Sequence, residues 1–182
     1  MPTTTSIVPD YETLAGTWES PDLEPIPGNV FLTRTFDFDS DGWRVRFSAW
    51  ADQQRKRRLF DGVAEGRFEL QGAWSAVPGA LAAIFRFNRR LFTVHTRALA
   101  EQLTKSGAGS GPWVPGIQQD VSKTGALFVP SLAASSEEYD LVVFDTGPHG
   151  EYDLYLGDRS HEMDTPANRP VKRNPFPVRK VD

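Results

Sequence analysis

Along much of the first half of the chain, apolar and polar residues alternate, which is the pattern of β-strands with one buried face. In residues 31–38 the more apolar face consists of Leu32, Arg34, Phe36 and Phe38. After the residues 39–42 (DSDG), the more apolar face of residues 43–51 consists of Trp43, Val45, Phe47 and Ala49. Asp, Ser and Gly favour tight turns, so we expect a β-hairpin whose two apolar faces line one interior.

The rest of the chain adds shorter strand patterns and one helix pattern. Further strand-like segments are residues 67–70, 81–88, 91–95, 139–144 and 152–156. A helix is predicted over residues 97–105, where Leu99 and Leu103 share an apolar stripe and Thr96 is a suitable N-cap. Many short strands with one prominent α-helix favour a mainly β fold, an antiparallel barrel or half-barrel.

The composition divides the chain into three segments. Residues 1–13 are expected to form an N-terminal extension, and residues 14–157 the β domain. Within that domain, residues 112–136 carry few strand signals and are suited to form a lid over an opening. Residues 158–182 are polar, proline-rich and basic near their end, so we expect a disordered tail.

The amino-acid content restricts the compartment and the chemistry. The 182 residues suffice for one domain with its own core. They include no cysteine, which favours a reducing compartment and excludes thiol catalysis and cysteine-ligated metals. The sequence has no recognisable signal peptide and no apolar run near the roughly 20 residues that span a membrane. We therefore expect a soluble, cytoplasmic protein without a membrane span.

Charge and motifs disfavour several other functions. The net charge is −4, so the basic run of residues 55–58 (RKRR) fits an exposed hairpin tip better than a nucleic-acid site. His95, His149 and His161 lack the spacing of metal ligands, and the sequence contains no phosphate-binding loop or nucleophile elbow. We expect no metal, no cofactor and no nucleic-acid partner.

The residues ahead of the first long strand carry a longer motif. Gly16-x-Trp18 matches the G-x-W opening of lipocalin-like calycins. The pattern L-x-G-x-W-x-S over residues 14–20, followed by P-G-x-x-F-L-T-R-x-F-x-F over residues 27–38, resembles the adenomatosis polyposis coli down-regulated family. The resemblance continues more loosely to residue 157. It implies a curved, calycin-like antiparallel sheet whose concave face holds a lipid-like molecule.

The sequence departs from the animal members of that family, which are membrane-anchored Wnt inhibitors. The animal proteins are disulfide-bonded, secreted and anchored, and they carry two copies of the domain. This chain has no cysteine, and we expect it to have no signal, no anchor and a single copy of the domain. The resemblance therefore implies a hydrophobic cavity but not Wnt inhibition.

Aromatic residues in or beside the strands are the candidates to line such a cavity. The chain has 12 Phe, 5 Trp and 4 Tyr, and small residues such as Ala49 and Ala83 accompany them, which favours a shaped cavity over a uniformly filled interior. The predicted ligand-binding residues are Arg34, Phe36, Phe38, Trp43, Val45, Phe47, Trp74, Phe85, Phe87 and Trp113.

Arg34 is a charged residue on an otherwise apolar strand face, so a buried guanidinium there needs a partner. One interpretation is structural: Arg34 stacks on Trp18 at the base of the barrel, as the calycin pattern implies. The other is a clamp that binds a ligand carboxylate or enolate. We favour the structural role and keep the clamp as the alternative.

Two functions remain open. The first is binding of a hydrophobic small molecule, lipid-like or polyketide-like, in the barrel cavity. The second is an enzyme that uses the same cavity for cyclisation or isomerisation of an apolar biosynthetic intermediate. For the enzyme, the catalytic candidates are His95, ahead of the helix, and Tyr139, which is flanked by acidic residues. A homo-oligomer is compatible with either function.

Overall fold

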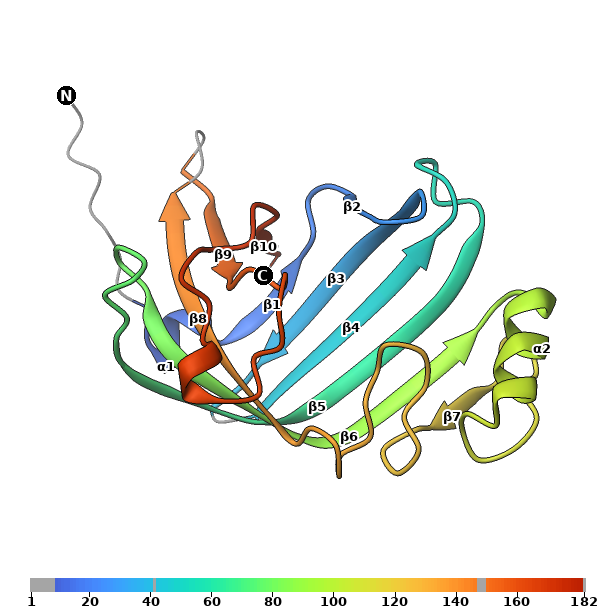
Figure 1. The fold of residues 1–182 in the computed structure, drawn as a ribbon. Helices are drawn as coiled ribbons and strands as arrows, with labels where there is room; N and C mark the ends of the chain where they lie inside the picture. Colours follow the sequence, from blue (N-terminus) through green and yellow to red (C-terminus); the bar gives the residue numbers. More distant parts are fainter. Residues whose placement is uncertain (1–8, 41, 147–149, 182) are drawn as a thin grey trace.

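The computed structural model describes residues 9–40, 42–146 and 150–181, and in them the chain forms an antiparallel sheet of 10 strands (Figure 1). The strands are β1 Gly16–Glu19, β2 Glu24–Ile26, β3 Val30–Phe38, β4 Gly42–Trp50, β5 Arg58–Ala73, β6 Leu81–Val94, β7 Gln118–Asp120, β8 Glu137–Thr146, β9 Tyr152–Leu156 and β10 Val178–Lys180. The helices are α1 Tyr11–Leu14, α2 Arg97–Ser106 and the 3-10 turn η1 Pro166–Asn168. The mainly β fold with one prominent helix, α2, is confirmed.

Eight of these strands close into a ring. Their order is β1-β10-β9-β8-β6-β5-β4-β3, and β1 closes the ring by pairing with the C-terminal half of β3. The N-terminal half of β3 pairs with β2 instead, and β7 pairs with β6 outside the ring. The long strands β3 to β6 therefore take part in a barrel at one end and continue as a curved, open sheet at the other (Figure 1).

Trp18, the tryptophan of the G-x-W motif, belongs to the hydrophobic cluster inside the barrel. Its side chain is almost completely buried and stacks on Phe144, with 5.4 Å between the ring centres. The indole Nε1 donates a 2.8 Å hydrogen bond to the carbonyl of Leu14. Gly16 has a φ of 118°, a conformation that favours glycine, and this lets the chain turn into the barrel just before Trp18.

Helix α2 and the loops that follow it cover the open end of the sheet. Ala100 and Leu103 of the helix belong to the same hydrophobic cluster as Phe60 and Phe92, which lie on the inward face of β5 and β6. The helix begins at its predicted cap, where the Thr96 hydroxyl accepts a hydrogen bond from the N–H of Leu99. The interior thus has two apolar clusters, one inside the barrel and one under α2.

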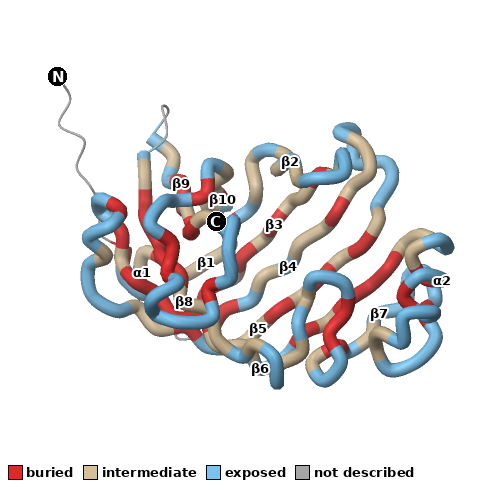
Figure 2. The backbone as a smooth tube through the Cα atoms, in the orientation of Figure 1, coloured by how far each residue is buried: buried red, intermediate tan, exposed pale blue. Residues whose placement is uncertain are grey.

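The interior faces of β3 and β4 are those that the alternation predicts. Figure 2 shows buried residues recurring along β3 to β6 between more exposed ones. Phe36 and Trp43 are buried on the inward face. Val45 and Phe47 share that face but are only partly buried, because the space in front of them is not filled by other side chains.

The two terminal segments differ from the sequence expectation. Residues 9–13 were expected to be an extension, but Asp10 caps helix α1 by accepting a 2.7 Å hydrogen bond from the N–H of Thr13. Residues 158–181 were expected to be disordered, but they end in β10, which lies between β1 and β9. Val178 of this strand is fully buried. Three strand residues are too short a pattern to stand out from a polar, proline-rich composition, although they complete the ring.

Candidate ligand-binding site

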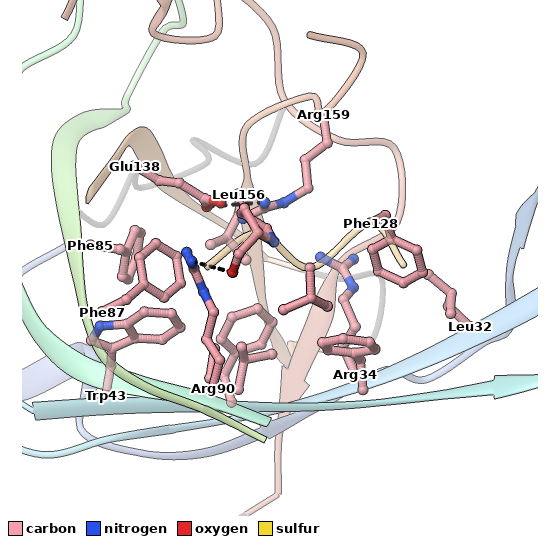
Figure 3. Close-up of a pocket in the computed structure, with 16 residues that line it drawn as sticks. Leu32, Arg34, Trp43, Phe85, Phe87, Arg90, Phe128, Glu138, Leu156 and Arg159 are labelled. Carbon is pink, nitrogen blue, oxygen red and sulfur yellow. Dashed lines mark hydrogen bonds and ion pairs between the residues drawn. The ribbon is translucent and has the colours of Figure 1, made fainter. Parts of the chain in front are cut away.

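A cavity of about 250 Å³ lies between the barrel cluster and the cluster under α2 (Figure 3). Its lining comes from β3, β4, β5, β6 and β8, and from the loop of residues 128–130. Leu156, the last residue of β9, and Arg159, three residues after it, complete the lining. The predicted ligand-binding residues that line it are Arg34, Phe36, Trp43, Val45, Phe47, Phe85 and Phe87. The structure therefore brings seven of the ten predicted residues to one cavity.

The other three predicted residues lie elsewhere. Phe38 belongs to the barrel core, where its ring meets Phe68 edge-on at 5.2 Å. Trp113 is buried under α2, and its Nε1 donates to the carbonyl of Ala108. Trp74 packs against a third apolar cluster, formed by Val77, Ala80, Leu141 and Val143, and its Nε1 donates to the carbonyl of Pro170. These side chains fill the protein around the cavity rather than line it.

One side of the cavity is an aromatic wall, formed by Trp43, Phe85 and Phe87. The Trp43 ring meets Phe85 and Phe87 edge-on, with centres 4.9 and 5.3 Å apart. Its indole Nε1 donates a 3.2 Å hydrogen bond to the carbonyl of Arg86. Edge-to-face rings that are held by a hydrogen bond keep their orientation, so this wall is a rigid apolar surface.

Phe47 reaches its position because β5 has glycine opposite it. Gly62 pairs with Phe47, and a Cβ atom at Gly62 would overlap the Phe47 ring. The ring can therefore lie directly over the β5 backbone. Ala64, the next inward residue of β5, also lines the cavity, and the two small residues keep this part of the interior open.

A β-bulge in β6 decides which side chains of this strand face the cavity. β6 is one continuous strand, where the sequence predicts two, over residues 81–88 and 91–95. Its register against β5 shifts at Asn88, which is the extra residue. Before the bulge the odd-numbered residues of β6 face inward, and after it the even-numbered residues do. Phe87 and Arg90 therefore both face inward. The guanidinium carbon of Arg90 lies 4.0 Å from the centre of the Phe87 ring.

Arg34 is 9% exposed and pairs with Glu24, not with Trp18 as the sequence analysis favoured. Its Nε lies 3.0 Å from a Glu24 carboxylate oxygen, and its Nη2 donates a 2.8 Å hydrogen bond to the carbonyl of Phe176. Burial lowers the pKa of Arg34, and the Glu24 charge opposes that effect. Arg34 lies beyond the part of β3 that pairs with β1, and the cation over Trp18 is Lys180, at 5.5 Å.

Arg90 is the second cation of the cavity and is only 2% exposed. Its Nη1 donates hydrogen bonds of 2.8, 3.1 and 2.7 Å to the carbonyls of Pro130, Ser131 and Ser135. Burial lowers the pKa of Arg90, because the charged form loses water. Arg90 thereby holds the loop that forms one edge of the cavity.

Arg159 is the third cation and belongs to the segment that was expected to be disordered. Its Nη1 donates a 3.1 Å hydrogen bond to Glu138, and its Nη2 lies 3.5 Å from Asp140. Partial desolvation of the guanidinium opposes its charge, but the carboxylates of Glu138 and Asp140 raise the pKa of Arg159 overall. Asp140 is completely buried, which raises its pKa, while Arg159 opposes the rise.

The two catalytic candidates do not reach the cavity. His95 Nε2 lies 2.7 Å from a carboxylate oxygen of Asp61, on the outward side of the sheet, and Asp61 also accepts from the Ser48 hydroxyl. The hydroxyl of Tyr139 donates to Glu137, and this bond raises the pKa of Tyr139. Neither His95 nor Tyr139 lines the cavity. His149 lies outside the described residues.

Sequence analysis missed Arg90, Glu138 and Arg159, whereas the loop of residues 128–130 belongs to the segment 112–136 that it predicted as a lid. Arg90 is one of two adjacent arginines between two apolar runs, and the sequence pattern predicts that this pair is the gap between two strands. Arg159 was overlooked because its segment was treated as a tail. Glu138 lies on the same face of β8 as Val142 and Phe144, which belong to the core inside the barrel. The alternation of side chains along this strand could therefore have predicted that Glu138 faces inward.

Two further observations concern the residues that the structure describes. They contain no group of three or more His, Asp or Glu side chains that could hold a metal ion. None of their helices is both long enough and apolar enough to cross a membrane. Fold and site together define a barrel-like, mainly β protein with an internal cavity that is aromatic on one side and lined by arginines on another.

The comparison with protein families agrees with the sequence motif. The family model described as Adenomatosis polyposis coli down-regulated 1 matches residues 2–168, which is most of the chain. The chain therefore belongs to this family, as the motif around Trp18 predicts.

Proposed function

We propose that the chain binds a hydrophobic small molecule, lipid-like or polyketide-like, in the cavity between the barrel and α2. The observation that carries the proposal is a cavity of about 250 Å³ with a rigid aromatic wall. Protein interiors are normally close-packed. A largely apolar cavity with a few converging polar groups is the usual form of a small-molecule site.

The resemblance to calycins supports the same function, since it implies a curved sheet whose concave side holds a lipid-like molecule. We place binding ahead of cyclisation or isomerisation, because both catalytic candidates, His95 and Tyr139, lie away from the cavity. A cytoplasmic location is part of this proposal and rests on the absence of cysteine.

The test is titration with N-phenyl-naphthylamine, an uncharged dye whose fluorescence rises in apolar surroundings. We expect the chain to bind the dye, and Ala64→Phe to weaken binding about tenfold or more, because the new ring occupies the cavity. The matched control is Val63→Phe, since Val63 is the neighbouring β5 residue with the opposite orientation. Circular dichroism and thermal melts establish that both variants are folded.

Unchanged binding in folded Ala64→Phe, or an equal loss in Val63→Phe, would place the dye elsewhere and contradict the proposal. Absence of dye binding by the unmodified chain, together with no binding of aliphatic ligands, would contradict it as well.

A further inference from the structure

Three arginines from distant parts of the chain point into the cavity. Arg34 comes from β3, Arg90 from β6 just after the bulge, and Arg159 from the segment after β9. Figure 3 shows their guanidinium groups directed toward the same space, beside the aromatic wall. Glu138 is the carboxylate among the described lining residues, so the lining itself carries an excess of positive charge.

Of these three arginines, Arg90 is the one that forms no direct ion pair with a carboxylate of the described residues. Glu24 pairs with Arg34, and Glu138 pairs with Arg159. Within the described part of the chain no ion pair includes Arg90, although it is more deeply buried than Arg34. Its partners are neutral carbonyl groups, and all three of these bonds start from Nη1. The charge of Glu138 favours the Arg90 cation, but this carboxylate is paired with Arg159. A buried cation without a direct counter-ion is costly to a folded protein.

We infer that the ligand carries a carboxylate that binds to Arg90, while its apolar part lies along the aromatic wall. The inference rests on the proposed function, since it names the chemistry of the molecule in the same cavity. A guanidinium can donate two parallel hydrogen bonds to one carboxylate. The carbonyl bonds hold Arg90 in place through Nη1 and leave Nε and Nη2 as donors. Arg34 and Arg159 add positive charge at the same space.

An uncharged ligand of the same shape lacks this interaction. It would bury Arg90 further and take away what water reaches the guanidinium, without supplying a negative charge. The cavity should therefore distinguish an acid from the corresponding alcohol, although both place the same chain along Trp43, Phe85 and Phe87.

The experiment compares decanoic acid with decanol by isothermal titration calorimetry at neutral pH. We expect the unmodified chain to bind the acid about tenfold or more tightly than the alcohol, the ratio that corresponds to a charged hydrogen bond. Arg90→Met should abolish this preference, so that the acid and the alcohol bind to this variant with affinities within about threefold of each other. The matched control is Arg89→Met, because Arg89 is the adjacent residue, exposed and paired with Asp120 on the outer side.

A second variant, Arg90→Lys, keeps the charge and should keep part of the preference for the acid. It also protects the test against a structural failure of Arg90→Met, since the Arg90 carbonyl bonds hold the loop. Equal binding of acid and alcohol by the unmodified chain overturns the inference and leaves the proposed function standing. An acid preference that survives in folded Arg90→Met, or that disappears equally in Arg89→Met, overturns the assignment to Arg90. Binding of neither ligand, nor of the uncharged dye, overturns the proposed function itself.

Discussion

The ion pair between Arg34 and Glu24 can be tested by its contribution to the free energy of unfolding. Replacing Arg34 with methionine removes the cation and leaves Glu24, which is 15% exposed, without its partner at 3.0 Å. Breaking a buried ion pair costs about 3–5 kcal/mol. Because Glu24 keeps some access to water and a 3.3 Å hydrogen bond from Asn174, we expect a loss of about 2–3 kcal/mol.

The second step of the test replaces Glu24 with glutamine, which keeps an acceptor for Asn174 but carries no charge. In the double variant no unpaired charge remains, so we expect it to recover about 1–2 kcal/mol relative to Arg34→Met alone. The assay is urea unfolding at neutral pH, followed by far-ultraviolet circular dichroism, for all four chains of the cycle. A parallel cycle pairs Arg34→Met with Trp18→Phe, and its effects should add within about 0.5 kcal/mol.

The two cycles distinguish the ion pair from the stack that the sequence analysis favoured. Additive effects of the Arg34 and Glu24 substitutions, together with a coupling above about 1 kcal/mol between Arg34 and Trp18, would refute the reasoning. That result would mean that the guanidinium of Arg34 lies over the indole and not beside the Glu24 carboxylate.

Three further predictions concern other features of the fold. Gly62→Ala should destabilise the protein by about 1–3 kcal/mol and displace Phe47 into the cavity, whereas Gly72→Ala, where a Cβ meets nothing, should change the free energy of unfolding by less than about 0.5 kcal/mol. Burial raises the pKa of Asp140 above its usual 3.8, so the folded state holds this proton more tightly than the unfolded state. The stability of the unmodified chain, measured relative to Asp140→Asn by urea unfolding, should therefore fall as pH rises from below 3.8 to the folded-state pKa; a relative stability that rises with pH would contradict this. A chain that ends at Ser160 lacks β10 and should lose several kcal/mol or aggregate, which thermal melts and size-exclusion chromatography would detect.

The alternation of side chains was sufficient to predict the inward faces of β3 and β4, because a strand without a bulge keeps its period of two. Trp43, Val45 and Phe47 were assigned to the cavity on this basis, and the structure places them in its lining. The same rule failed in β6, where the bulge at Asn88 changes the period and brings Arg90 inward. A bulge is specified by pairing with the neighbouring strand, and a single sequence does not contain that information in its hydrophobic pattern.

Charged residues were harder to place than aromatic ones for a related reason. The partner of Arg34 is Glu24, on a three-residue edge strand, and the partner of Arg159 is Glu138, 21 positions earlier in the chain. The hydrophobic pattern locates a face of a strand, but the choice among several carboxylates depends on register and on the paths of loops. For this reason the cavity was predicted better than its charges.

The strand β10 has a consequence for how the protein is made. Trp18 of β1 pairs with Lys180 of β10, so the last contact of the ring joins residues 162 positions apart. At about 5–20 residues per second, a ribosome needs about 8–32 s to add the residues between them. During that time β1 can pair with β3 but not with β10, and β9, once it has been made, has no neighbour on one side until β10 follows. Unpaired strand edges recruit other chains, so the cell has to protect two edges of this protein until synthesis reaches β10.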